Sequence, residues 1–168
     1  PVFKFTYQKL IPKWTKENDN MFEIKQDKIE ADDIIALSCK YIKEKFKDKD
    51  IYIVSGDEDF LQLGDDNVYF ANYRKKKVFQ LTKDEANNAL IKKIVEGDCS
   101  DNIPSIFKGK RIPNKKSLLE DIDKLMDFIN DNTDYKKKYD SNKKIIDFDF
   151  IPEKFKKKFN KVAKTIFV

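Results

Sequence analysis

The amino-acid sequence predicts an α/β fold with a mostly parallel sheet flanked by helices, followed by a helical C-terminal part. Two observations support this fold class. Short apolar segments rich in β-branched and aromatic residues alternate with segments of helical periodicity up to about residue 95, which is typical of a layered α/β domain. After Gly97 this alternation stops. We therefore expect two parts, residues 1–95 and residues 96–168.

The elements of the first part follow from local patterns. Apolar residues from Ile29 to Phe46 have helical spacing, with lysines on the opposite face. Thr82, with Glu85 three residues later, forms a capping-box start for a helix that reaches about Val95. Alternation and composition predict strands at 3–7, 22–24, 51–55, 68–71 and 77–81, with a helical turn at 60–63.

The second part is expected to be less regular. Pro152 is a favourable first residue for a last helix, which has a lysine-rich face. Before it we predict a turn at 98–104, a basic loop at 108–116, an amphipathic helix at 118–129, a polar insertion at 130–144 and a strand-like segment at 145–151.

Composition excludes several kinds of chemistry. The 168 residues contain no His and two Cys, which removes histidine-based triads, most zinc sites and a disulfide scaffold. No apolar run reaches the roughly 18 residues of a membrane span. The 35 basic residues, nearly all Lys, exceed the 30 acidic ones, which suits either sequence-independent phosphate contact or a solvated surface. We expect an intracellular monomer and, since the first residue is Pro1, a fragment or a processed chain.

Three acidic groups stand at junctions between predicted elements. Taken singly, each could be a helix cap, a partner of the helix dipole worth about 0.3–1 kcal/mol, or a solvated turn. An EF-hand does not fit, because Leu61 and Gln62 stand where an acid and a glycine belong. A phosphatase-type Asp-x-Asp nucleophile stays open. The groups are Glu30-Ala-Asp32-Asp33, Asp57-Glu58-Asp59 and Asp98-Cys-Ser-Asp101.

Together, the three acidic groups predict a metal site. Ligand sites in open parallel sheets gather at the carboxyl ends of the strands, so we expect the groups to converge at one edge. Carboxylates a few ångströms apart repel one another strongly in a low dielectric. Hard divalent cations such as Mg²⁺ or Mn²⁺ would relieve that repulsion. Two such ions can support phosphodiester hydrolysis without any histidine.

The same three groups resemble motifs of the flap endonuclease/5′-nuclease superfamily, in the order in which that superfamily has them. A later segment, Ile145-Ile-Asp-Phe-Asp-Phe-Ile-Pro152, is similar to the C-terminal segment of its T-even phage RNase H branch. The resembling motifs are Glu30-Ala-Asp32-Asp33-Ile-Ile-Ala, Val54-Ser-Gly-Asp57-Glu-Asp59-Phe-Leu-Gln-Leu63 and Glu96-Gly-Asp98-Cys-Ser-Asp101-Asn102-Ile103-Pro104.

The resemblance implies a PIN-like nuclease core joined to a helix–turn–helix type DNA-binding region. It implies a metal-dependent, structure-specific 5′-3′ exonuclease or flap endonuclease that acts on DNA or RNA primers in replication or repair. The implied substrates are flaps, nicks or RNA–DNA primer junctions, with replication proteins as partners. The phage branch implies the cytoplasm or nucleus of a host. Two alternatives are a non-catalytic nucleic-acid-binding relative and a Mg²⁺-dependent small-molecule phosphatase.

Site residues carry over through the matched motifs. Glu30 and Asp32 would hold the first ion, and Asp57 and Asp59 the second. Asp98 or Asp101 would hold metal-bound waters, and Asp33 would support the site. The catalytic residues would be these four and Asp98. The segment after the Gly-Asp signature binds K⁺ and grips the duplex backbone in this superfamily. The residues that would meet phosphates are Lys108, Lys110, Arg111, Lys115 and Lys116.

Parts of the superfamily pattern are missing from this sequence. The first two catalytic Asp residues and the basic arch have no counterpart upstream of Phe22. The Gly-Ile-Gly-Pro-Lys-Thr-Ala hairpin of many members is replaced by Gly109-Lys-Arg-Ile-Pro-Asn-Lys-Lys.

Overall fold

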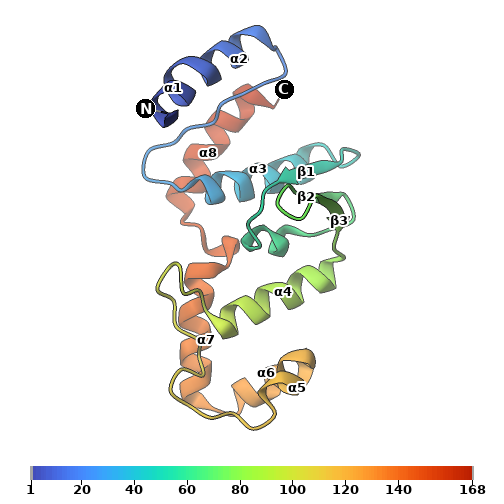
Figure 1. Ribbon diagram of the computed structural model, residues 1–168, viewed down its shortest axis with the longest axis vertical. Helices are drawn as coiled ribbons and strands as arrows, with labels where there is room; N and C mark the ends of the chain where they lie inside the picture. Colours follow the sequence, from blue (N-terminus) through green and yellow to red (C-terminus); the bar gives the residue numbers. More distant parts are fainter. Residues whose placement is uncertain (1, 168) are drawn as a thin grey trace.

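The computed structural model describes the backbone of residues 2–167 and the side chains of residues 4–167. It is an elongated α/β molecule with a small sheet near its middle (Figure 1). Helices α3 (Ala31–Lys45) and α8 (Glu153–Ile166) lie on one side of the sheet in this view. On the other side, α4 (Lys83–Glu96) and α7 (Thr133–Ile146) continue away from it. The predicted α/β class is confirmed.

The sheet of the described residues has three strands in the order β1-β2-β3. Strand β1 (Ile51–Val54) pairs in parallel with β2 (Val68–Asn72), which pairs antiparallel with β3 (Lys77–Gln80). The sheet is therefore mixed, and the prediction of a mostly parallel sheet is wrong. The cause is the short β2–β3 connection, which allows a hairpin but not a parallel crossover.

A first hydrophobic cluster joins the sheet to α3 and α8. Its buried residues include Leu37 of α3, Phe70 of β2 and Phe159 of α8. Tyr41 of α3 contacts the ring of Phe159 edge-on, with ring centroids 6.5 Å apart. The last helix, predicted from Pro152, is thus confirmed and covers this core.

A second hydrophobic cluster joins α4 to the helices that follow it. Ile94 of α4, Ile106 of the next loop, and Leu125 and Ile129 of helix α6 (Ile122–Asn130) are fully buried in it. The capping box predicted at Thr82 is confirmed. The Thr82 backbone N–H donates to Glu85 Oε2 at 2.8 Å, and the Glu85 backbone N–H donates to Thr82 Oγ1 at 3.2 Å.

The N-terminal segment is helical, so the strand predicted at residues 3–7 is wrong. Helix α1 (Val2–Phe5), a π-helical turn (Thr6–Leu10) and α2 (Ile11–Glu17) follow one another. Tyr7, Ile11 and Trp14 are spaced by four and three residues, which places them on one helical face, and they line a groove together. Residues 22–24 are irregular, not a strand.

The helix predicted at 118–129 is two helices, α5 (Lys115–Glu120) and α6. Asp121 separates them because its backbone is extended, with φ −112° and ψ 95°. Its Oδ1 accepts a hydrogen bond from the Lys124 backbone N–H at 3.1 Å. Asp121 therefore acts as the N-cap of α6, a role that the apolar periodicity on both sides of it concealed.

The polar insertion predicted at 130–144 is also wrong, because helix α7 occupies it. Asn132 caps this helix by accepting hydrogen bonds from the backbone N–H groups of Asp134 and Tyr135, both at 3.1 Å. The strand-like segment predicted at 145–151 is the end of α7 followed by a 3₁₀ turn, Phe148–Phe150. Low overall hydropathy hid a narrow buried stripe formed by Tyr139, Asn142 and Ile146.

Each of the two hydrophobic clusters contains residues from both parts of the predicted division, residues 1–95 and 96–168. Ile151 and Phe159 belong to the first cluster, whereas Ile91 and Ile94 belong to the second. The two-part division at that position stays a prediction. None of the helices in the described part of the chain is long and apolar enough to cross a lipid bilayer.

Candidate metal centre

The end of β1 turns sharply and presents two carboxylates. The Asp57 backbone N–H donates to Ser55 Oγ at 3.0 Å, and the Asp59 backbone N–H donates to Asp57 Oδ1 at 3.0 Å. Asp59 then opens a 3₁₀ turn, Asp59–Leu63, that packs against α4. One oxygen of Asp57 is therefore engaged by the turn, while Asp59 is carried towards α4.

The loop after α4 presents the next carboxylates. Asp98 and Ile103 form a short antiparallel bridge, with N–H···O distances of 2.8 and 2.7 Å. The Ser100 backbone N–H donates to Asp98 Oδ1 at 2.7 Å. Gly97 allows this loop to form, because its φ of +74° is unfavourable for other residues and a Cβ there would lie 2.4 Å from Ile103 O.

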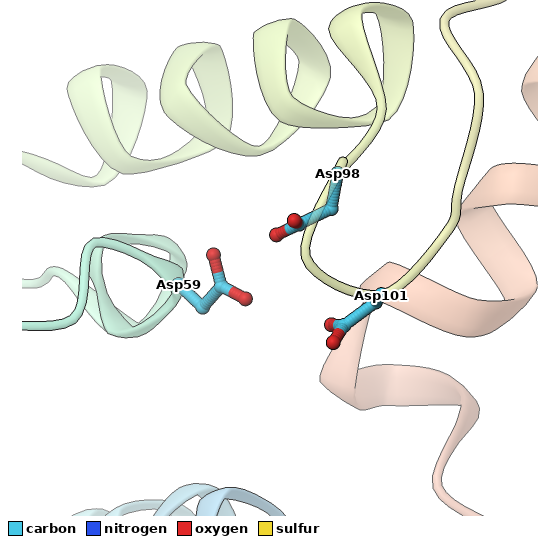
Figure 2. Close-up of side chains that lie close together, drawn as sticks. All are labelled: Asp59, Asp98 and Asp101. Atoms are coloured by element: carbon cyan, nitrogen blue, oxygen red, sulfur yellow. The ribbon is translucent and has the colours of Figure 1, made fainter.

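These two segments meet to form the acidic cluster, which we define as Asp59, Asp98 and Asp101. One carboxylate oxygen from each lies within 4.8 Å of the other two. Figure 2 shows the three side chains facing a common space, Asp59 from the 3₁₀ turn and the other two from the loop after α4. Carboxylate oxygens are the ligands that hard divalent cations prefer. The cluster could therefore hold a metal ion.

Lys93 of α4 reaches into the acidic cluster. Its Nζ lies 2.6 Å from Asp59 Oδ1 and forms a shorter ion pair with Asp98 Oδ2. Asp59 Oδ1 is buried and accepts no hydrogen bond of favourable geometry within the described part of the chain. Burial lowers the pKa of Lys93, but the contacts with both carboxylates outweigh burial and raise that pKa to about 12. Lys93 is thus a permanent internal cation that links the two segments.

Lys93 also controls the ionisation of Asp98. The hydrogen bond from Lys93, followed by those from Ser100, holds the pKa of Asp98 well below its usual range. Asp98 is therefore ionised throughout the physiological pH range and is available as an anionic ligand.

The first acidic group lies at the start of α3, close to the end of β1. Burial raises the pKa of Asp32, and the negative charges of Asp57, Asp59 and Glu30 raise it further, followed by that of Asp33. Burial and the charge of Glu30 also raise the pKa of Asp33. Of the first group, Asp32 is thus within electrostatic reach of Asp57 and Asp59. Convergence of all three groups at one site stays a prediction.

The predicted site residues do not all lie in the acidic cluster. Asp59 groups with Asp98 and Asp101 in it, whereas Asp57 is engaged in its own turn. Glu30 is the N-cap residue of α3, and its exposed side chain makes no capping hydrogen bond within the described residues. The metal-binding and catalytic roles expected for these residues stay predictions.

The five predicted phosphate-binding residues are exposed, but they are spread over the second part. Lys108 lines the same groove as Asp101. Figure 1 shows α5, which begins with Lys115 and Lys116, at the end of the molecule away from the sheet. Lys110 and Arg111 lie in the exposed loop before it. Of the five, Lys108 is the one that lines a groove together with a residue of the acidic cluster, Asp101.

Three residues that support the site were missed at the sequence level. They are Lys93, Gln62 and Asn142. The Gln62 side-chain amide donates to Asp59 O at 3.0 Å and to Ile146 O at 3.2 Å, and its Oε1 accepts from the Phe148 backbone N–H at 3.0 Å. Asn142 donates to Ile94 O at 3.0 Å and Pro104 O at 2.9 Å. For Asn142, the signal in the sequence was a polar residue at helical spacing between Tyr139 and Ile146.

The fold and the acidic cluster define an α/β protein with a candidate divalent-metal centre. Comparison with known proteins gives its family. The family model for the 5′-3′ exonuclease N-terminal resolvase-like domain matches residues 8–93. The chain thus belongs to the 5′-3′ exonuclease family, and the resemblance to the 5′-nuclease superfamily is confirmed.

Individual relatives agree with this assignment. The chain is 38% identical over 110 residues to a 5′-3′ exonuclease of Mycoplasmopsis pulmonis, covering 57% of this chain and 36% of that protein. It is 33% identical over 147 residues to ribonuclease H of Enterobacteria phage T4, covering 76% and 46%. It is 33% identical over 112 residues to a 5′-3′ exonuclease of Buchnera aphidicola, covering 58% and 38%. The chain thus spans less than half the length of each of these curated relatives.

Proposed function

We propose that this chain carries part of the active site of a divalent-metal-dependent 5′-nuclease. The enzyme would hydrolyse phosphodiesters near the 5′ end of DNA or of RNA primers, at flaps, nicks or RNA–DNA junctions. The observation that carries the proposal is the convergence of Asp59, Asp98 and Asp101 within 4.8 Å, in a chain of the 5′-3′ exonuclease family.

The roles of the residues follow from their positions. Asp59, Asp98 and Asp101 would hold one Mg²⁺ or Mn²⁺ ion through their oxygens. Glu30, Asp32, Asp33 and Asp57 would hold a second ion or its waters. When bound, such ions stabilise the charge on the phosphate oxygens and activate water. Lys93 holds Asp59 and Asp98 together and neutralises part of their charge.

Cleavage of a 5′-flap DNA with labels at both ends tests this proposal. With Mg²⁺ or Mn²⁺ the chain should release short 5′-labelled products, and EDTA should stop their release. Asp59→Asn and Asp98→Asn should each slow cleavage by about 100-fold. The matched control is Asp123→Asn, which changes an exposed acid in the first turn of α6 and should cut as the unaltered chain does.

A second candidate function is nucleic-acid binding without cleavage. The observation that favours it is Lys93, whose ammonium group already pairs with two carboxylates of the acidic cluster and offsets part of their charge. Retention of the flap DNA with no metal-dependent product would support this function over hydrolysis. Hydrolysis of a small phosphoester by a chain that ignores DNA would instead favour a phosphatase and contradict both.

A further inference from the structure

A groove of about 560 Å³ lies between α7 and the loop that carries Asp101 of the acidic cluster. One wall is the loop that carries Asp101, Pro104 and Lys108, and the other is a face of α7 that carries Lys138, Ser141 and Ile145. The spacing of three and four residues places these α7 side chains on one helical face. The groove shares one residue, Asp101, with the acidic cluster.

The charges in this groove are uncompensated. Within the described part of the chain, neither Lys108 nor Lys138 forms a salt bridge, whereas the neighbouring Lys136 pairs with Asp140 at 3.2 Å. Lys138 Nζ donates to Ile106 O at 3.4 Å, which holds the ammonium group against the loop wall. Two cationic side chains thus face one groove without an anionic partner, except for Asp101 at its end.

The rest of the lining is mixed: Asn102, Ser105, Ser141 and Asn142 are polar, whereas Ile103, Pro104 and Ile145 are apolar. Ile145 is 69% exposed, although it lies next to Ile146, which is buried in the second cluster. A groove that combines two cations, hydrogen-bonding side chains and an exposed aliphatic side chain suits a sugar–phosphate chain. Lysines in such a groove can contact phosphates, while a sugar can lie against the aliphatic side chain.

We infer that this groove binds the backbone of a nucleic-acid strand that leads to or from the acidic cluster, with Lys138 of α7 as a phosphate contact. The inference rests on the proposed function, because it names the path of the substrate of that same site. It assigns a binding role to a lysine in the segment, residues 130–144, that the sequence predicted to be a polar insertion. The occupant is a strand backbone, so its contacts are independent of base sequence.

Fluorescence anisotropy with a labelled 5′-flap DNA in Ca²⁺, over a series of salt concentrations, tests the inference. Lys138→Gln should weaken binding about three- to tenfold at low salt and reduce the salt slope by about one. Lys137→Gln removes the same charge from the same helix, at an exposed position outside the groove. It should leave both quantities nearly unchanged.

A second pair of variants probes the exposed apolar side chain of the groove, Ile145. Ile145→Glu places an acid on the groove and should weaken binding at least as much as Lys138→Gln. Thr133→Glu adds the same charge at the exposed start of α7 and should have little effect. Because Ile145 and Thr133 are both exposed, thermal unfolding should stay unchanged in both variants.

Binding of the flap DNA by the unaltered chain separates a failure of the groove from a failure of the proposed function. If the unaltered chain binds no flap DNA, the proposed function is overturned together with the groove. If it binds, and each groove variant equals its matched control, the groove is overturned while the proposed function stands. Weaker binding by both groove variants, with both controls normal, supports the groove as a strand-binding site.

Discussion

The sheet region, formed by β1–β3, α3 and α8, and the helical region, formed by α4–α7, supply the acidic cluster in different ways. In the sheet region Asp59 opens the 3₁₀ turn that follows β1, so regular elements do the positioning. In the helical region the carboxylates lie on an irregular loop. Gly97 and Asn142 determine the shape of that loop.

Lys93 and Gln62 are the links between the regions, because Lys93 pairs with a carboxylate from each and Gln62 joins the Asp59 turn to the end of α7. The site thus depends on two hydrophobic clusters, on the packing of the Asp59–Leu63 turn against α4, and on these polar contacts. Variants that disturb one region or one link should separate these contributions.

The largest effect is expected at Gly97. Its φ of 74° and ψ of −171° lie in a region that is essentially restricted to glycine. A Cβ would also lie 2.4 Å from Ile103 O and 2.6 Å from the Pro104 carbonyl carbon. Gly97→Ala should therefore lower the free energy of unfolding by about 3 kcal/mol or more. Urea denaturation followed by circular dichroism measures this.

Gly109 provides the matched control for Gly97. Its φ is +76°, but no atom of the described residues lies within 4 Å of a Cβ there. Gly109→Ala should cost about 1 kcal/mol, which is the conformational penalty alone. Equal losses in the two variants would show that the close approach to Ile103 and Pro104 is unimportant for the loop.

The next effect is expected at Asn142, which is buried and donates to carbonyls of both α4 and the loop. Asn142→Ala leaves the Ile94 and Pro104 carbonyls without this donor, which should cost about 2 kcal/mol. Hydrogen exchange should show the loss concentrated in the helical region. Ser141→Ala, at the exposed neighbouring position, should change neither stability nor exchange.

A smaller effect is expected at the link, Lys93. Lys93→Gln leaves Asp59 and Asp98 close together without their cation, which should cost about 1–2 kcal/mol in metal-free buffer. Mn²⁺ should then raise the melting temperature of the variant more than that of the unaltered chain, because the ion replaces the lost charge. Lys92→Gln, one residue away, should respond to Mn²⁺ as the unaltered chain does.

The sheet region was largely predictable because its elements follow periodic rules. The strand at 51–54, the turn after it and the two hairpin strands were all expected from local patterns. The acids at these junctions followed from the same patterns. The antiparallel direction of β2 and β3 was missed, although the short connection between the two expected strands already requires a hairpin.

The helical region was less predictable because single polar side chains shape it. Asp121 divides an apolar periodic segment into two helices, and Asn132 starts a helix in a segment that is lysine-rich throughout. The partners of Lys93, Gln62 and Asn142 lie partly or wholly in other segments. Such contacts form only after both cores are packed, and local sequence patterns do not encode them.

The smallest effect concerns the charge of Asp32 in the sheet region. Because the folded-state pKa of Asp32 is raised by burial and by Asp57 and Asp59, the protonated form favours folding. That contribution is fully present below the usual aspartate range and is lost as pH rises through the raised pKa. Asp32→Asn cannot ionise, so in EDTA it should become more stable than the unaltered chain as pH rises to neutrality.

The expected gain from Asp32→Asn is below about 1 kcal/mol, since solvent screens much of the repulsion. Asp84 is the matched control, because it occupies the same second position of α4 that Asp32 occupies in α3, but is exposed. Asp84→Asn loses the same dipole contact without relieving any crowding, so it should not gain stability with pH. Urea titrations between pH 4 and pH 7 compare the two, and parallel curves would mean that the first acidic group does not face the end of β1.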